Sequence, residues 1–340
     1  MVNTDFSKYL TAYLSRYLPG QRNVSENTIK SYRDTFRLFL TFCKETKGIK
    51  PEKLTMDMIN SLLINEFLEW IENERKCSIS TRNQRLAGIH AFIRYVQIET
   101  PENLLSYQKI LHMPPKKGMH KPMSYLTPEA LAAILSEPDR NTSKGRRDLL
   151  LLTLLYDSGA RVQELINLRV RDVRVEKPAT VTIIGKGRKV RCIPLMTKTR
   201  SMVESYLQEH SLWQHAEKLD CLVFVNSRGE KLTRAGISYI INKYVLKAKE
   251  HSQILFPENI SPHVFRHSKA MHMLQANINL IYIRDFLGHS NVTTTEVYAK
   301  ADANAKRQAL EKAYNPVIHD DFPDWTEDKN LMDWLQTICK

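Results

Sequence analysis

Six polar residues have the types and spacing needed to bind a phosphodiester and attack it. They are Arg161, Lys186, His263, Arg266, His289 and Tyr298. An arginine can donate two hydrogen bonds to non-bridging phosphate oxygens, and donors held in place before the reaction stabilise the charge that develops on phosphorus. A tyrosine hydroxyl can be the nucleophile if a base or nearby cations assist it. The set therefore predicts attack by a phenol on a phosphate in a cationic site.

The pair His263 and Arg266 lies at a predicted helix start. Ser261 is a favourable N-cap residue and Pro262 suits the first helical turn. His263 and Arg266 are three residues apart, so they lie on the same side of that turn. The free N–H groups of a helix N-terminus attract anions, and the segment therefore predicts a phosphate site.

Arg161 follows a predicted helix break. Residues 145–158 form an almost wholly apolar run, and Gly159 is placed to end that helix. A helix that restarts at Arg161 can direct the guanidinium into a cleft. The alternative role for Arg161 is a structural salt bridge to Glu164, three residues later, and Glu164 itself is expected to support the structure rather than to react.

Lys186 lies between two glycines in Gly185-Lys186-Gly187, where a turn can approach a nucleic acid backbone closely. Breaking a phosphodiester expels an alkoxide, which needs a proton. Neighbouring cations make a lysine a better acid. A lysine of this hairpin, which carries Lys186, Arg188, Lys189 and Arg191, could therefore supply that proton, and the alternative is a solvated basic hairpin.

His289 and Tyr298 belong to one further segment. Gly288 is expected to stop the helix that precedes His289. Tyr298 is then expected on the next short helix, capped by one of Thr293, Thr294 or Thr295.

These segments, in this order, resemble the signature of the tyrosine recombinases, also called the phage integrase family. The motifs span 159–298, and a weaker likeness covers residues 1 to about 115. The resemblance implies that Tyr298 is the nucleophile and Lys186, rather than Lys189, the general acid. It also implies that His263 assists proton transfer and that His289 hydrogen-bonds the scissile phosphate.

The same resemblance implies a reaction and an assembly. The tyrosine would form a 3′-phosphotyrosyl ester with duplex DNA, so that rejoining needs no outside energy source. A pair of protomers would occupy each recombination site, and two such pairs would form a tetrameric synapse that passes through a four-way junction. No metal and no cofactor is expected.

The predicted fold is mainly α with a small antiparallel sheet, an α+β class. Short strands are expected at 180–184, 189–195 and 222–225. Prolines and glycine at 113–122 break the helical pattern and indicate a linker. The predicted organisation is a helical DNA-clamping domain (1–113), a linker (114–122), a catalytic domain (123–318) and an acidic C-terminal tail (319–340).

The N-terminal domain is expected to grip the DNA backbone with basic helix faces. A helix over 25–45 begins at Ser25, and another over about 80–98 begins at Ser80. Residues expected to bind DNA lie on these helices, on the hairpin and on a later helix from Thr233 to about Lys249: Lys30, Arg33, Arg82, Asn83, Arg85, Arg188, Arg234 and Lys243.

Composition agrees with an anionic partner. The chain of 340 residues carries a formal net charge of +13, which suits nucleic acid. No apolar run approaches the roughly 20 residues needed to cross a bilayer, so no membrane role is expected. The five scattered cysteines and the absence of a signal-peptide pattern favour the cytoplasm.

Several functional alternatives stay open. We expect an integrase or transposase of a mobile element, and the alternatives are a Xer-like resolvase of chromosome or plasmid dimers, an inactive DNA-binding accessory protein, and a type IB topoisomerase. A predicted amphipathic helix at 326–339 would dock either on its own subunit or on a neighbour.

Overall fold

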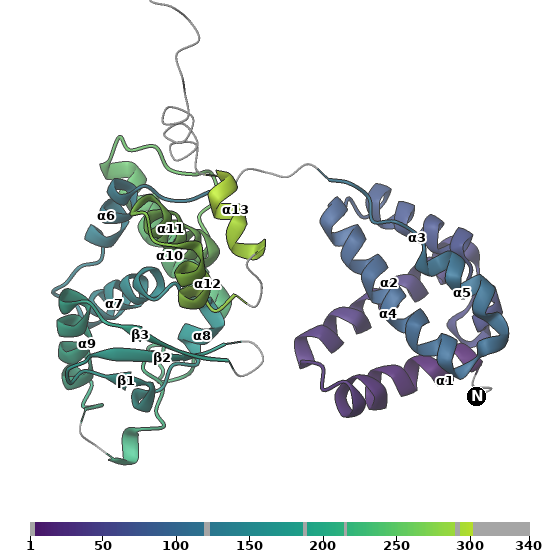
Figure 1. Ribbon diagram of the computed structural model, residues 1–340, viewed down its shortest axis with the longest axis horizontal. Helices are drawn as coiled ribbons and strands as arrows, with labels where there is room; N and C mark the ends of the chain where they lie inside the picture. Colours follow the sequence, from purple (N-terminus) through teal and green to yellow (C-terminus); the bar gives the residue numbers. More distant parts are fainter. Residues whose placement is uncertain (1–3, 119–122, 186–188, 214–215, 290–292, 302–340) are drawn as a thin grey trace, which may run out of the picture. The chain divides into compact units, whose positions relative to one another are not determined.

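The computed structural model describes residues 4–118, 123–185, 189–213, 216–289 and 293–301 (Figure 1). The chain forms two compact units, Met1–Lys121 and Pro122–Lys340. The predicted tail helix at 326–339 lies outside the described residues, as do Lys186 and Arg188. None of the described helices is both long and apolar enough to span a membrane.

The described part of the first unit contains helices joined by short loops, and no strand. Its α-helices are α1 (Asp5–Ala12), α2 (Glu26–Lys47), α3 (Ser61–Asn73), α4 (Ile79–Glu99) and α5 (Leu104–Leu111). Helix α2 begins as predicted, because Ser25 accepts a hydrogen bond from the backbone N–H of Thr28. Such a cap contributes about 1 kcal/mol to stability. The predicted start of α4 at Ser80 was wrong: the N-cap is Ser78, which bonds to the N–H of Thr81.

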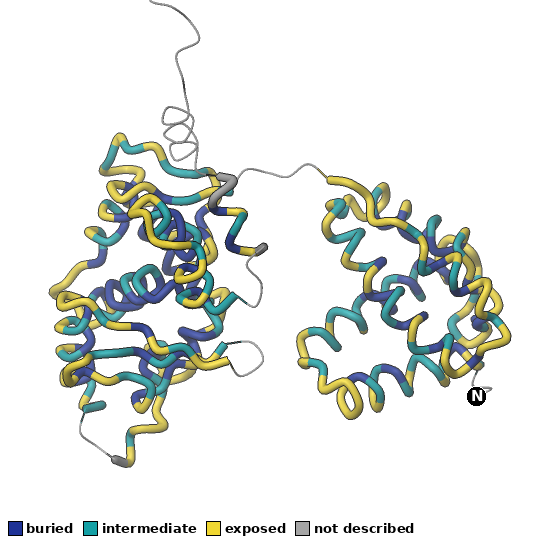
Figure 2. Tube along the Cα trace, viewed as in Figure 1, coloured by how far each residue is buried: buried dark blue, intermediate teal, exposed yellow. Residues whose placement is uncertain are grey.

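Helices α2 and α4 pack through an aromatic core. Phe36, Phe39 and Phe92 are almost fully buried, and Phe36 meets Phe92 edge to face with ring centroids 4.9 Å apart. Figure 2 shows the buried residues of both units in dark blue along the inward faces of the helices. The core fixes which faces of α2 and α4 point outward, and so which basic side chains can reach a partner.

The second unit combines helices with a small sheet. Its α-helices are α6 (Pro128–Ser136), α7 (Ser143–Asp157), α8 (Val162–Ile166), α9 (Thr197–Glu209), α10 (Arg234–His251), α11 (Pro262–Gln275), α12 (Leu280–Leu287) and α13 (Thr293–Ala301). The apolar run predicted at 145–158 forms most of α7, whose leucines are buried in the core of this unit. Each fully buried leucine contributes roughly 1.5–3 kcal/mol.

The sheet has three antiparallel strands in the order β1-β2-β3: β1 (Val173–Arg174), β2 (Thr180–Ile184) and β3 (Val190–Pro194). In the hairpin, Ile184 pairs with Val190, and Val181 pairs with Ile193. The predicted hairpin strands are confirmed. The third strand predicted at 222–225 was wrong, because that segment makes only the isolated bridges Arg169–Leu222 and Val225–Lys231.

Turn glycines set the ends of the helices that carry the site. Gly159, just after α7, has φ +53°, and Gly288, which ends α12, has φ +65°. Both values lie in the left-handed region that glycine adopts without strain. These turns let the chain reverse directly before Arg161 and directly before His289.

Candidate active site

Arg161 is hydrogen-bonded to the carboxylate of Glu164, three residues later. It is the N-cap residue of α8, and its backbone N–H donates to Glu164 Oε2 at 2.8 Å. Its Nη1 donates to Glu164 Oε1 at 2.9 Å. About one third (34%) of the Arg161 side chain is exposed, so it can still meet a ligand. The salt bridge to Glu164, weighed from the sequence as the alternative to a catalytic Arg161, is therefore present, and the exposed part of the side chain remains accessible.

Arg191 on β3 is a second partner of Glu164. Its Nη2 donates to Glu164 Oε2 at 2.6 Å, and both side chains are almost fully buried. Burial raises the pKa of Glu164, but hydrogen bonds from Arg191 and Arg161 outweigh that effect and hold the pKa below its ordinary value. The carboxylate is therefore ionised at neutral pH and links the two arginines.

Glycines make room for this network. A Cβ at Gly185 would lie 3.1 Å from Glu164 Oε1, and a Cβ at Gly288 would lie 3.0 Å from Arg191 Nη1. The hairpin and the end of α12 thus approach the charged groups at distances that a side chain would obstruct.

Helix α11 presents the predicted His263–Arg266 pair. Ser261 takes the N-cap position, but it makes no side-chain capping bond, in contrast to the prediction. His263 is exposed in the first turn, whereas Arg266 is only 3% exposed. Desolvation, followed by the charges of Arg266 and Arg161, lowers the pKa of His263.

Arg266 is fixed by two main-chain carbonyls. Nη1 donates to Gly159 O and Nη2 donates to Leu287 O, each at 2.6 Å. Burial, and then repulsion from Arg161 and Arg191, lowers the pKa of Arg266 to about 10, so it stays charged at neutral pH. The guanidinium therefore ties the ends of α7 and α12 together and brings a buried positive charge into the site.

His289 lies directly after the turn that ends α12. Its Nδ1 is 3.0 Å from Thr295 Oγ1 on α13, and its ring stacks parallel to that of Tyr298 with centroids 6.3 Å apart. Burial, then Arg266 and Arg161, lowers the pKa of His289 to about 4. The imidazole is therefore neutral at pH 7. Thr295 lies inside α13 and bonds this histidine, so it is not the predicted cap.

Tyr298 on α13 is buried, with 2% of its surface exposed. Its Oη lies 3.1 Å from His267 Nδ1. Burial raises the pKa of Tyr298, while Arg266 and then Arg161 lower it, and the net shift is upward. The hydroxyl thus lies within the field of both arginines and keeps its proton at neutral pH.

A cavity of about 250 Å³ adjoins these groups. It is lined by Gly185, Lys189, Val190, Arg191, Asp285, Gly288 and His289. Gly185 and Lys189 flank the segment 186–188 that carries the predicted general acid. The cavity joins the hairpin side of the site to the histidine that follows α12.

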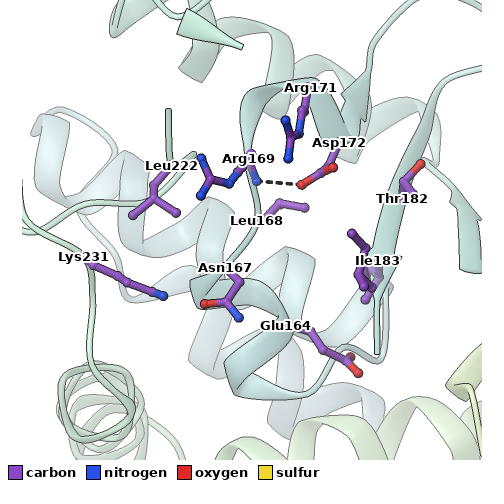
Figure 3. A pocket seen from close by; sticks show the side chains of 11 residues that line it. Glu164, Asn167, Leu168, Arg169, Arg171, Asp172, Thr182, Ile183, Leu222 and Lys231 are labelled. Carbon is purple, nitrogen blue, oxygen red and sulfur yellow. Dashed lines mark hydrogen bonds between the residues drawn. The ribbon is translucent and has the colours of Figure 1, made fainter. Parts of the chain in front are cut away.

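A separate pocket of about 390 Å³ is lined by residues of α8, of β2 and of the segments around Arg169 and Leu222 (Figure 3). Figure 3 shows Arg169, Arg171 and Lys231 around it. Of the five predicted catalytic residues that the structure describes, none lines this pocket. Glu164 borders this pocket and also bonds Arg161 and Arg191.

The residues predicted to bind DNA differ in their exposure and in the side chains that they already contact. Lys30 and Arg33 on α2 are exposed, and each has an acidic neighbour, Glu26 or Asp34. Arg234 on α10 is also exposed and donates to Gln163 Oε1 at 2.9 Å. Lys243 lies over the ring of Tyr244, 4.6 Å from its centroid.

The polar side chains in the first turns of α4 form hydrogen bonds within the first unit. Arg85 Nη1 donates to Ser31 O and to Thr35 Oγ1 of α2. Asn83 bonds both the N–H and the carbonyl of Lys116, so it holds the chain that leaves the unit. Arg82 donates to Asn83 Oδ1 at 3.1 Å. Arg85 and Asn83 therefore have structural partners in addition to any contact with DNA.

Sequence reasoning passed over two residues of the site. Arg191 was expected only as a neighbouring cation, and its pairing with Glu164 spans 27 positions. His267 was not singled out at all. Its signal was available, because it follows Arg266 and lies four residues after His263 on the same helix face.

The arrangement suits phosphoryl transfer from a nucleic acid to a phenol. Arg161 and Arg266 place positive charge beside Tyr298 Oη, and His263 and His289 add neutral imidazoles at the edges of the same region. Donors fixed in a desolvated site stabilise a charged transition state more than they would in water.

Comparisons with known proteins agree with this chemistry. Residues 124–305 match the phage integrase family, and residues 10–100 match the N-terminal SAM-like domain of phage integrases. A putative integrase/recombinase of Sinorhizobium fredii, y4rC, is 35% identical over 303 residues, which cover 89% of this chain and 90% of that protein. Tyrosine recombinase XerC of Roseiflexus castenholzii is 32% identical over 292 residues, covering 83% of this chain and 86% of XerC.

Solved structures share the fold. The XerH site-specific recombinase bound to palindromic difH substrate aligns with a TM-score of 0.67 at 22% identity, covering 89% of this chain and 84% of XerH. The Tn1549 transposon integrase in complex with transposon right end DNA aligns with a TM-score of 0.66 at 18% identity, covering 88% of this chain and 97% of the integrase.

Proposed function

Because the chain belongs to the phage integrase family of tyrosine recombinases, which break and rejoin DNA, we propose that Tyr298 is the residue that cleaves the strand. Attack by Tyr298 Oη on a backbone phosphate forms a 3′-phosphotyrosyl ester and frees a 5′ hydroxyl. The observation that supports this assignment is the position of Tyr298 Oη, where Arg266 and Arg161 both act on its pKa.

The other proposed roles follow from position and charge. Arg161 and Arg266 bind the non-bridging oxygens of the phosphate, and one well-placed arginine accelerates phosphoryl transfer by roughly 10³–10⁵-fold. His289 hydrogen-bonds the same phosphate. Lys186 protonates the departing 5′ oxygen, as the family resemblance implies.

The proposed partner is duplex DNA, bound by a homo-oligomer with two protomers per site and four in the synapse. Two structural neighbours were solved as DNA complexes, XerH with difH substrate and the Tn1549 integrase with transposon right end DNA. For the biological role we propose integration or transposition of a mobile element, supported by the similarity to y4rC over most of both chains. The alternative is Xer-like dimer resolution, supported by the similarity to XerC.

Trapping the covalent intermediate tests the nucleophile. A duplex is selected from a random pool for binding to the full chain, and a set of versions is made with single nicks at different positions. A nick near the cleavage point lets the short 5′-hydroxyl fragment diffuse away, so the adduct accumulates. We expect a denaturation-resistant adduct whose phosphotyrosine maps to Tyr298 by mass spectrometry.

Two matched variants complete the test. Tyr298→Phe should bind the selected duplex as wild type does and form no adduct, whereas Tyr282→Phe, at an exposed tyrosine of α12, should form it normally. An adduct from Tyr298→Phe would remove the assignment. A wild-type chain that binds the duplex but never forms an adduct would favour the accessory-protein alternative.

The biological role needs a different assay. Recombination between two plasmids that each carry the selected site indicates a recombinase, whereas relaxation of one supercoiled plasmid without exchange indicates the topoisomerase alternative. Insertion of a plasmid that carries the element's ends into an unrelated target would support the mobile-element role over dimer resolution.

A further inference from the structure

The hydroxyl of Tyr298 has a defined hydrogen-bond partner in His267. The distance from His267 Nδ1 to Tyr298 Oη is 3.1 Å, and the two rings lie at 56° with centroids 5.7 Å apart. Tyr298 is buried, and its ring also stacks with that of His289. Among the described residues, His267 is the group found within hydrogen-bond distance of the reacting oxygen.

A phenol that attacks phosphorus must lose its proton. Burial raises the pKa of Tyr298 more than Arg266 and Arg161 lower it, so the attacking group begins as a neutral hydroxyl. A base can take that proton when it lies within about 2.6–3.2 Å of the oxygen or reaches it through one water. His267 Nδ1 meets this requirement.

His267 is in a state that can accept a proton. Burial, followed by the charges of His263 and Arg266, lowers its pKa to about 4, so the ring is neutral at pH 7. In the tautomer with hydrogen on Nε2, Nδ1 is an acceptor and the tyrosine hydroxyl donates to it. Binding of a DNA phosphate between the arginines adds negative charge nearby, which raises the proton affinity of His267. Proton removal is thereby coupled to the arrival of DNA.

His263 is less well placed for this proton. It is exposed in the first turn of α11, and its ring centroid lies 6.4 Å from that of His267. Within the described part of the chain, the hydroxyl of Tyr298 is hydrogen-bonded to His267 and not to His263. The position of His263 at the helix N-terminus suits contact with the phosphate instead.

We propose that His267 is the catalytic base that takes the proton of Tyr298 during strand cleavage. The Oη–H bond breaks as its proton moves to His267 Nδ1, and the Oη–P bond forms while the P–O5′ bond breaks. The 5′ oxygen leaves with a proton from the general acid. In rejoining, protonated His267 returns its proton to the departing phenol. The inference rests on the proposed role of Tyr298 as nucleophile.

The test combines a base variant with a more acidic nucleophile. His267→Asn keeps a hydrogen-bonding amide near the Nδ1 position but cannot take up a proton. Each protein is made with tyrosine or with 2,3,5-trifluorotyrosine at position 298, and the rate of adduct formation is measured in a single turnover on the nicked duplex. General bases contribute roughly 10²–10⁴-fold to such steps.

We expect His267→Asn to slow adduct formation by about 10²-fold or more with tyrosine and by less than about 10-fold with trifluorotyrosine, because a more acidic phenol depends less on a base. DNA binding should be unchanged. His263→Asn is the matched control, and its rate loss should be the same with both phenols.

Each other outcome has a defined meaning. A rate loss that is equal for both phenols in His267→Asn, or no loss, would overturn the proton path alone. A phenol-dependent loss in His263→Asn would assign the base to His263. Absence of any adduct from the wild-type chain would overturn the nucleophile together with its base.

A second variant covers the case in which His267→Asn fails to fold. His267→Ala leaves space for a small base, so added imidazole should restore adduct formation, with rates that rise with the pKa of substituted imidazoles. If His267→Ala is folded by circular dichroism and binds the duplex, but gains no rate from any imidazole, the proposal is wrong.

Discussion

Arg191 donates two hydrogen bonds to the carboxylate of Glu164, at 2.6 and 3.3 Å, across the space between β3 and α8. Both side chains are more than nine-tenths buried, so neither charge has water to replace its partner. Breaking a buried pair by removing one partner costs about 3–5 kcal/mol. The pair therefore anchors β3 to α8 beside the candidate site.

Glu164→Gln is expected to lower the free energy of unfolding by about 3 kcal/mol, measured by urea denaturation. The matched control is Glu204→Gln, which removes a more exposed pair with Arg200 at 3.5 Å on α9. That change should cost less than about 1 kcal/mol. Equal losses in the two variants would mean that the buried pair contributes no more than a surface one.

Gly288→Ala is expected to impair both stability and cleavage. An alanine in the left-handed region costs roughly 1–2 kcal/mol, and its Cβ would lie 3.0 Å from Arg191 Nη1. Gly229→Ala is the control, because Gly229 has φ +77° with no atom within 4 Å of the added Cβ. Urea denaturation should show a larger loss for Gly288→Ala, and its rate of adduct formation should fall. Equal losses of stability and of cleavage rate in the two variants would show that Arg191 moves away from the added Cβ at no cost.

Stability should decline as the pH falls from about 6.5 to about 4. Burial and neighbouring cations lower the pKa of His267 and of His289 to about 4, whereas unfolded histidine titrates near 6.5. In this window the unfolded chain binds more protons than the folded chain, so the free energy of unfolding falls with pH. Urea midpoints between pH 6.5 and 5 should fall less steeply in a double variant, His267→Asn with His289→Asn. An unchanged slope would contradict the lowered pKa values.

Replacing two arginines of the N-terminal unit by alanine should have different effects, one on DNA binding and the other on stability. Arg33 is exposed on α2, so Arg33→Ala should weaken DNA binding and reduce the slope of log affinity against log salt by about 1, with stability unchanged. Arg85 bonds Ser31 and Thr35 in the core-facing region, so Arg85→Ala should lower the free energy of unfolding by about 1–3 kcal/mol. Fluorescence anisotropy at several salt concentrations and urea denaturation measure the two effects. A salt slope unchanged in Arg33→Ala would remove this residue from the DNA interface.

Local patterns in the sequence were sufficient for much of the fold. Apolar periodicity predicted α2, α4 and α7, and the strands around Gly185 were found within a residue or two. The prediction failed at 222–225, because an apolar run does not reveal whether a neighbouring strand is available to pair with it. It also failed at Ser80, where Ser78 is an equally good cap two residues earlier.

The sequence by itself determined the family, because the order and spacing of the arginine, lysine, histidine and tyrosine motifs are local properties of the chain. Only the tertiary structure decided which groups touch. Arg266 reaches Gly159 across 107 positions, Arg191 reaches Glu164 across 27, and His267 reaches Tyr298 across 31. Contacts of this kind depend on how α8, α11, α12, α13 and β3 pack against one another, and packing is a property of the whole unit rather than of any single segment.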